Sequence, residues 1–198
     1  MAAESVNHGR RRFLTASTVV VGGVGGIFVA VPFLSAWKPN AKAVAAGAPV
    51  TADISRLAVG QQMTVAWRGR PIFIVRRSPE MLAALPSEDS RLRDPQSSVE
   101  DQQPSFAQNG YRSLRPELLV LVGSCTHLGC SPKLHTEVKP EPWDSKWKGG
   151  YYCPCHNSRF DLAGRVYEGS PAPTNLVVPP YRFESDTKVI IGESEGAA

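Results

Sequence analysis

The hydrophobic pattern of the chain begins with a long apolar run, from Phe13 to Trp37, that contains no charged residue. As an α-helix these 25 residues would be about 37 Å long, which exceeds the ~30 Å of a membrane's hydrocarbon core. The apolar core of a cleaved signal peptide spans only roughly 7–15 residues, so a permanent span is favoured over that alternative. The pattern therefore predicts a short N-terminal segment over residues 1–12 and a single transmembrane helix over 13–37.

The segment that follows the apolar run has no periodic apolar face. Residues 38–49 read KPNAKAVAAGAP and consist largely of Ala and Gly. Such a composition is typical of a linker that can change its length, and part of it can form a helix. We therefore expect a flexible tether over residues 38–49.

Residues 50–198 show the short alternating and apolar runs of a β domain, separated by Gly and Pro. Ser78–Leu85 is predicted to be a helix, since Ser-Pro-Glu supplies an N-cap and a first-turn proline. The polar stretch 86–116 is predicted to be a long surface excursion. This pattern predicts a mainly β fold, an antiparallel sandwich or barrel. The expected strands are 62–67, 71–76, 118–122, 150–152, 159–162, 176–178, 181–184 and 188–191.

The positive charge of the chain is concentrated near its N-terminus. The formal net charge is +4, and residues 1–42 hold five basic residues and one acidic residue, which accounts for all of it. Residues 43–198 hold 17 residues of each sign. A domain with balanced charge lacks the basic footprint of a nucleic-acid-binding protein, so that class is excluded.

Three arginines, residues 10–12, precede Phe13 and Leu14 at the start of the apolar run. Arg10 and Arg11 followed by Phe-Leu resemble a twin-arginine export signal, which is read by a receptor. The alternative is that the arginines only enforce a positive-inside orientation. Both interpretations place the N-terminus in the cytoplasm and the β domain in the periplasm, with one span in the bacterial inner membrane.

All four cysteines and two of the four histidines fall into two clusters, CTHLGC at 125–130 and CPCHNS at 153–158. A catalytic Cys–His pair needs one thiolate rather than four cysteines, and a structural zinc site favours Cys-x-x-Cys knuckles. Two plain disulfides leave the histidines unexplained. An iron–sulfur centre with two Cys on one iron and two His on the other accounts for the pattern, and the two remaining cysteines can form a disulfide. Outside the clusters, His135 is expected to be a solvated loop residue, and His8 is incidental.

These two clusters resemble the cluster-binding motifs of Rieske iron–sulfur subunits of cytochrome bc complexes, in their bacterial form. The resemblance extends to the membrane anchor, the tether at 45–50, the Tyr-Arg-Ser sequence at 111–113 and Pro-Ala-Pro at 171–173. It implies one [2Fe–2S] cluster, a cluster-binding part at about 120–173, and residues with four roles. The implied iron ligands are Cys125 and Cys153 on one iron and His127 and His156 on the other, with His156 also the implied proton acceptor. The implied disulfide is Cys130–Cys155. The residues implied to surround the cluster are Leu128, Pro154, Ser158, Phe160 and Pro171.

The resemblance also implies a mechanism and a set of partners. The tethered domain would oxidise quinol bound in cytochrome b at the outer membrane face, His156 taking the proton, and would then deliver the electron to a haem c subunit. The membrane anchor would lie in lipid, and the complex would be dimeric. Three alternatives remain open here. They are a soluble Rieske ferredoxin, which lacks the two extra cysteines, the small subunit of a periplasmic oxidase such as arsenite oxidase, and a zinc-stabilised interaction module.

One residue departs from the pattern of the high-potential members of this family. Phe160 stands where those members carry Tyr, whose hydroxyl donates a hydrogen bond to a cysteine-ligand sulfur. Because Phe lacks that donor, we predict a lower midpoint potential than in the Tyr-containing members. The segment 131–152 between the motifs is longer than in mitochondrial relatives and is called the insert below.

Overall fold

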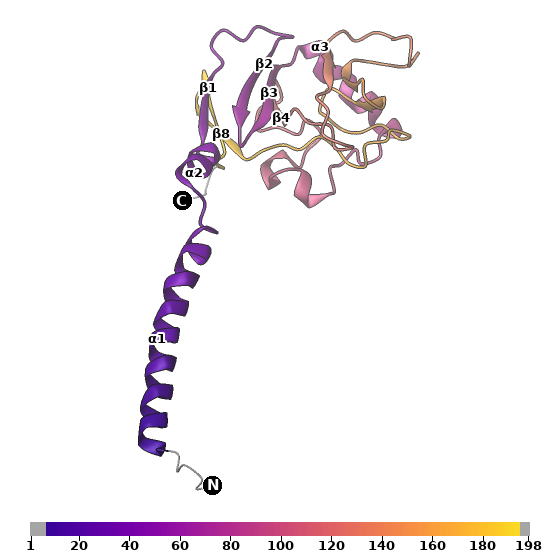
Figure 1. Cartoon of the computed structure of the whole chain (residues 1–198). Coiled ribbons are helices and arrows are strands. Elements are labelled where there is room, and N and C mark those ends of the chain that lie inside the picture. Colours follow the sequence, from indigo (N-terminus) through magenta and orange to yellow (C-terminus); the bar gives the residue numbers. More distant parts are fainter. Residues whose placement is uncertain (1–6, 195–198) are drawn as a thin grey trace. The chain divides into compact units, whose positions relative to one another are not determined.

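The structure is a computed structural model that describes residues 7–194, apart from the side chains of Lys42 and Ala46. The chain divides into two compact units, Met1–Ala45 and Ala46–Ala198, which are described separately (Figure 1). Residues 1–6 of the predicted cytoplasmic segment lie outside the described residues.

The first unit is dominated by helix α1, His8–Ser35. The Asn7 side chain caps its N-terminus by accepting a hydrogen bond from the Arg10 N–H at 3.0 Å. The helix is long and apolar enough to cross a membrane. It begins five residues before the predicted span, because its N-cap, Asn7, precedes the arginines. It ends at Ser35, before Trp37. A second, short helix, α2 (Ala41–Gly47), forms within the predicted tether.

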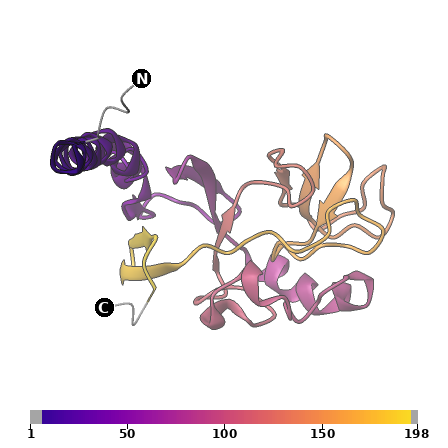
Figure 2. The same cartoon turned by 60° about the horizontal axis from the view of Figure 1, so that its bottom comes forward.

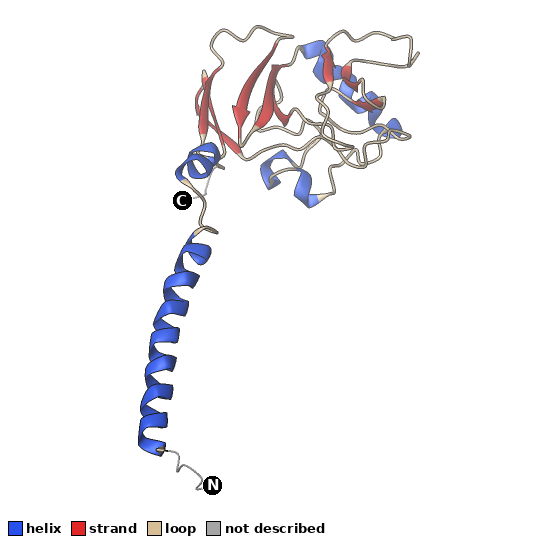
Figure 3. Ribbon diagram, viewed as in Figure 1, coloured by secondary structure: helices blue, strands red, loops and turns tan. Residues whose placement is uncertain are grey.

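The described residues of the second unit form three antiparallel sheets of three strands each, which confirms the predicted mainly β class (Figure 3). The sheet β1–β9–β8 and the sheet β5–β6–β7 lie at opposite ends of this unit (Figures 1 and 2). The strands are β1 (Val50–Asp53), β2 (Gln62–Trp67), β3 (Arg70–Arg76), β4 (Leu118–Val122), β5 (Lys133–His135), β6 (Gly150–Cys153), β7 (Ser158–Phe160), β8 (Tyr181–Ser185) and β9 (Lys188–Ile191).

The core gathers around the central sheet. All five residues of β4 are buried, and Ile72, Phe73, Ile74 and Val75 of β3 are buried as well. This confirms the fully apolar run at 118–122 as a buried strand. Helix α3 (Pro79–Ala84) begins after the N-cap Ser78, as predicted, and buries Met81 against the core.

The prediction of a strand at 176–178 is wrong. Leu176–Val178 is extended, but its backbone bonds go to three separate segments rather than to one neighbouring strand. The Leu176 N–H donates to Gly164, the Val122 N–H donates to Val177, and the Val178 N–H donates to Gln102. The apolar residues of this segment therefore fill a gap between loops, and no ladder forms.

The interpretation of residues 86–116 as a surface excursion is also wrong in part. The segment contains three 3₁₀ turns, η1 (Leu85–Arg91), η2 (Glu100–Gln102) and η3 (Ser105–Ala107). The side chain of Arg112 is fully buried, and its Nη1 donates to the Leu176 carbonyl at 2.7 Å. The buried guanidinium of Arg112 therefore ties this polar segment to the rest of the unit by pairing with a distant backbone carbonyl, as buried polar groups require.

Candidate metal centre

Two short loops carry the cysteine and histidine motifs. The first follows β4, and the second joins β6 to β7. In the first loop the Cys125 N–H donates to the Cys130 carbonyl at 2.7 Å, and the Gly129 N–H donates to the Cys125 carbonyl at 2.9 Å. In the second loop the Asn157 N–H donates to the Cys153 carbonyl at 3.0 Å. Gly129 and Asn157 have φ of +85° and +62°, a region that favours Gly and Asn, so each motif forms a tight turn.

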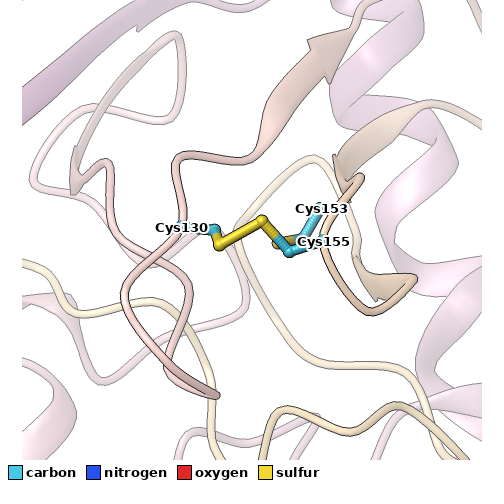
Figure 4. A group of neighbouring side chains, drawn as sticks. All are labelled: Cys130, Cys153 and Cys155. Carbon is cyan, nitrogen blue, oxygen red and sulfur yellow. A yellow bond between two sulfur atoms is a disulfide. The ribbon is translucent and has the colours of Figure 1, made fainter.

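A disulfide between Cys130 and Cys155 joins the two loops (Figure 4). Their Cα atoms are 6.6 Å apart and 25 residues separate them in sequence. The pairing implied by the family resemblance is therefore confirmed. The Cys153 sulfur lies within 4.8 Å of both disulfide sulfurs. Because a disulfide sulfur is not a thiolate, Cys130 and Cys155 are excluded as metal ligands, and two free thiols remain.

The free thiols belong to Cys125 and Cys153, and both are buried. Burial raises the pKa of the Cys125 thiol, while the His127 N–H and the Ser158 hydroxyl oppose that rise by stabilising the thiolate. Cys153 and Ser158 are paired across β6 and β7, so the sheet fixes Ser158 beside the thiols.

The imidazole rings of His127 and His156 meet edge to face, with centroids 4.6 Å apart. The Nδ1 atom of His127 is buried and has no hydrogen-bond partner among the described residues. His156 is exposed. A buried ring nitrogen without a partner is costly unless it binds something absent from the protein itself. Two soft thiols and two imidazoles, one with an orphaned nitrogen, match the donor set of a Rieske [2Fe–2S] cluster.

The other predicted residues surround these donors or lie elsewhere in the chain. Leu128 is 72% exposed, and Pro154 and Pro171 are also exposed; these three apolar residues are called the rim below. The Ser158 Oγ accepts a hydrogen bond from the Ala172 N–H at 3.1 Å, which links the second loop to residues 171–173, the proline-rich segment. Phe160 is fully buried. Arg10 and Arg11 lie in α1, in the first unit.

The expectation for His135 is wrong. It lies in β5, opposite Gly150 of β6, and its ring meets the rings of Trp143 and Trp147 edge to face at 5.3 and 6.5 Å. The insert thus forms a strand and an aromatic cluster. The sequence did contain a sign that the insert is folded. Trp143 and Trp147 lie four residues apart in a polar segment, and solvated loops seldom carry two tryptophans.

Comparison with known proteins agrees with this geometry. The Rieske [2Fe-2S] domain model matches residues 48–182, and a model for the TAT signal of the ubiquinol–cytochrome c reductase Fe–S subunit matches residues 1–40. The ubiquinol–cytochrome c reductase iron–sulfur subunit of Allochromatium vinosum is 54% identical over 198 residues, covering 100% of this chain and 95% of the relative. The chain belongs to the family of Rieske iron–sulfur subunits of ubiquinol–cytochrome c reductase.

Two further members of the Rieske subunit family match almost the whole chain. The subunit of Blastochloris viridis is 44% identical, covering 92% of both chains. That of Bradyrhizobium diazoefficiens is 41% identical, covering 96% of this chain and 98% of the relative. The family decides against the arsenite-oxidase-like, ferredoxin and zinc-module alternatives. It supports one Rieske [2Fe–2S] cluster, and the N-terminal signal model together with α1 fits a single-pass membrane anchor.

Proposed function

We propose that the chain holds its [2Fe–2S] cluster between the two disulfide-linked loops and serves as the quinol-oxidising subunit of a quinol–cytochrome c reductase. Cys125 and Cys153 would bind one iron, and His127 and His156 the other. The observation that carries this assignment is that two disulfide-linked loops hold two buried free thiols and two imidazoles in contact with each other, one of which has an orphaned Nδ1. When bound, the cluster supplies a one-electron centre of raised potential, because neutral imidazoles replace two thiolates.

The two histidines are suited to different tasks. The Nδ1 of His127 is buried, whereas His156 is exposed at the rim. If one ring nitrogen of His156 held iron, the other would stay accessible to a quinol hydroxyl and could take the quinol proton. The exposed apolar side chains of Leu128, Pro154 and Pro171 would exclude water from this contact once the rim is docked.

The proposed organisation follows the sequence boundaries. Residues 1–12 would lie in the cytoplasm, 13–37 would span the membrane lipid, 38–49 would form the tether, and 50–198 would form the periplasmic domain, with the cluster-binding part at about 120–173. Family membership implies cytochrome b and a haem c subunit as partners, in a complex that we propose to be dimeric. The single anchor would keep the domain near both partners at high effective concentration.

A comparison of matched histidine variants tests the ligand assignment. The purified complex of the unaltered chain should contain two irons for each Rieske chain and give a Rieske-type EPR signal after reduction. His127→Gln and His156→Gln should each abolish that signal and the bound iron. His135→Gln is the control, because it removes an imidazole of the same β unit that lies outside the two loops. Loss of iron in His135→Gln, or a retained signal in His156→Gln, would overturn the assignment.

A further inference from the structure

A surface cleft of about 390 Å³ lies beside His156. One wall is Trp143 from the insert, whose ring stacks on Tyr152 with centroids 4.6 Å apart and planes 25° apart. Pro171 of the proline-rich segment also lines the cleft. The cleft is therefore a slot in which aromatic rings and a proline stand beside polar side chains, and it adjoins the proposed quinol-oxidising site at His156.

The Trp143 wall is held in place by its neighbours. The carboxylate of Asp144 pairs with the guanidinium groups of Arg91 and Arg159. Its Oδ2 atom lies 3.1 Å from the Nη1 atom of Arg159. Trp147 is buried and packs on Tyr167 with ring centroids 5.6 Å apart. The insert is therefore fastened to η1 and to β7, so the slot is formed in the free protein rather than upon binding.

Two polar side chains that line this slot, Asn157 and Arg159, keep hydrogen-bond donors without partners among the described residues. The Tyr152 hydroxyl donates to the Asn157 Oδ1 at 2.5 Å, which leaves the amide NH₂ of Asn157 as a donor. Arg159 uses only Nη1 in side-chain bonds to the described residues, so Nε and Nη2 remain. Among the described residues that line the slot, none is acidic.

The charges behind the slot leave an excess of positive charge. Among the described residues, Arg91, Arg159 and Lys148 share two carboxylates, those of Glu88 and Asp144. Free donors beside a surplus cation favour a carboxylate ligand. The slot lies at the surface beside the exposed residues His156 and Pro171, so it can receive a protruding side chain of a docked protein.

We propose that the slot receives an acidic side chain of a partner subunit in the same complex, with its methylene groups against Trp143 and its carboxylate at Arg159 and Asn157. This inference rests on the proposed function, because docking at the rim brings the partner to the slot. It makes Arg159 and Trp143 specificity-determining residues for docking, distinct from the cluster ligands.

Photocrosslinking in the purified complex tests this proposal. Trp143 is replaced by photoreactive benzoylphenylalanine, and the crosslinked peptide is identified by mass spectrometry. The expected product joins residue 143 to a peptide of a partner subunit that carries Asp or Glu at or next to the linked residue. The matched control places the same probe at Tyr111, which is also exposed but lies outside the slot. A peptide without an acidic residue, crosslinking only to lipid, detergent or another copy of this chain, or no product would overturn the proposal.

A second substitution in the probe-carrying chain tests the charge. Arg159→Gln should lower the crosslink yield about tenfold, because a charge-assisted bond is lost. Arg159→Lys should retain most of the yield, and Arg56→Gln, which removes an exposed cation outside the slot, should leave it unchanged. An unchanged yield in Arg159→Gln would overturn the proposal. The iron content and EPR signal of each variant are measured in parallel, so that a failure of the cluster assignment is distinguished from a failure of docking.

Discussion

The ring of His127 meets the ring of His156 edge to face, 4.6 Å between centroids, although the two residues are 29 positions apart. Three features bring them together. The disulfide joins their loops, the pairing of Cys153 with Ser158 fixes the second loop, and the Thr126 hydroxyl binds the Thr174 carbonyl at 2.7 Å. The four proposed ligand residues are therefore held in place by the disulfide and by backbone and hydroxyl hydrogen bonds, none of which uses a sulfur or ring nitrogen that would bind iron.

Removal of the disulfide is expected to lower both stability and cluster retention. The Cys130→Ser, Cys155→Ser double variant frees a loop of about 25 residues, which costs about 3 kcal/mol of unfolding free energy. The measurement is urea denaturation of the oxidised protein, together with iron content. The unaltered chain under reducing conditions is the matched control, since it should show the same loss. Unchanged iron retention in the double variant would contradict the role given to this link.

A hydroxyl added at Phe160 is expected to raise the midpoint potential. Phe160 is fully buried and paired with Tyr151 across β6 and β7, so a tyrosine there would be held in the same sheet as the proposed ligand Cys153. One hydrogen bond to a ligand sulfur favours the reduced state by about 20–60 mV. Protein-film voltammetry of Phe160→Tyr measures this shift. Phe183→Tyr in β8 is the control, with no shift expected, and an unchanged or lower potential for Phe160→Tyr would sink the idea.

The sequence predicted the chemistry of the site better than the packing around it. The ligand spacing and the buried run at 118–122 are local properties, and both were readable from the chain. The path of Leu176–Val178 and the burial of Arg112 depend on contacts with segments far away in sequence. The strand at Lys133–His135 was missed because only three residues pair, with one polar residue at each end. The aromatic cluster around His135 likewise forms only when the insert folds back on β6.

Asp144 is expected to make stability dependent on pH in the acid range. Burial opposes its ionisation, but the Lys146 N–H and the cations Arg91 and Arg159 hold the pKa of Asp144 below its usual value. A carboxyl whose pKa is lower in the folded state stabilises the fold above its unfolded pKa of about 3.9, and this stabilisation is lost as the pH falls through the folded pKa.

The Asp144→Asn variant should therefore be less stable than the unaltered chain at pH 7, by about 1–2 kcal/mol, and the gap should narrow below pH 4. Urea denaturation at pH 7 and pH 3 measures both. Glu117→Gln, which changes a carboxylate that forms no salt bridge with the described residues, provides the control. A gap that stays constant between the two pH values would show that the charge of Asp144 is irrelevant.

Stiffening the tether is expected to slow turnover without changing the metal centre. Prolines at Ala43 and Ala45 would break α2 and fix the backbone within residues 41–47. If the domain must move between two partners, steady-state quinol–cytochrome c reductase activity should fall severalfold while the EPR spectrum stays the same. Serine at the same two positions is the matched control and should retain activity. Full turnover in the proline variant would refute a mobile domain for this protein.

The ligation of one iron by His127 and His156 is tested most directly by pulsed EPR of the reduced complex with ¹⁵N-labelled histidine. The account predicts two strongly coupled imidazole nitrogens, and it predicts that both couplings persist in the His135→Gln variant. A paramagnetic centre with one coupled histidine nitrogen or none, or the absence of a paramagnetic centre in the reduced protein, would contradict it.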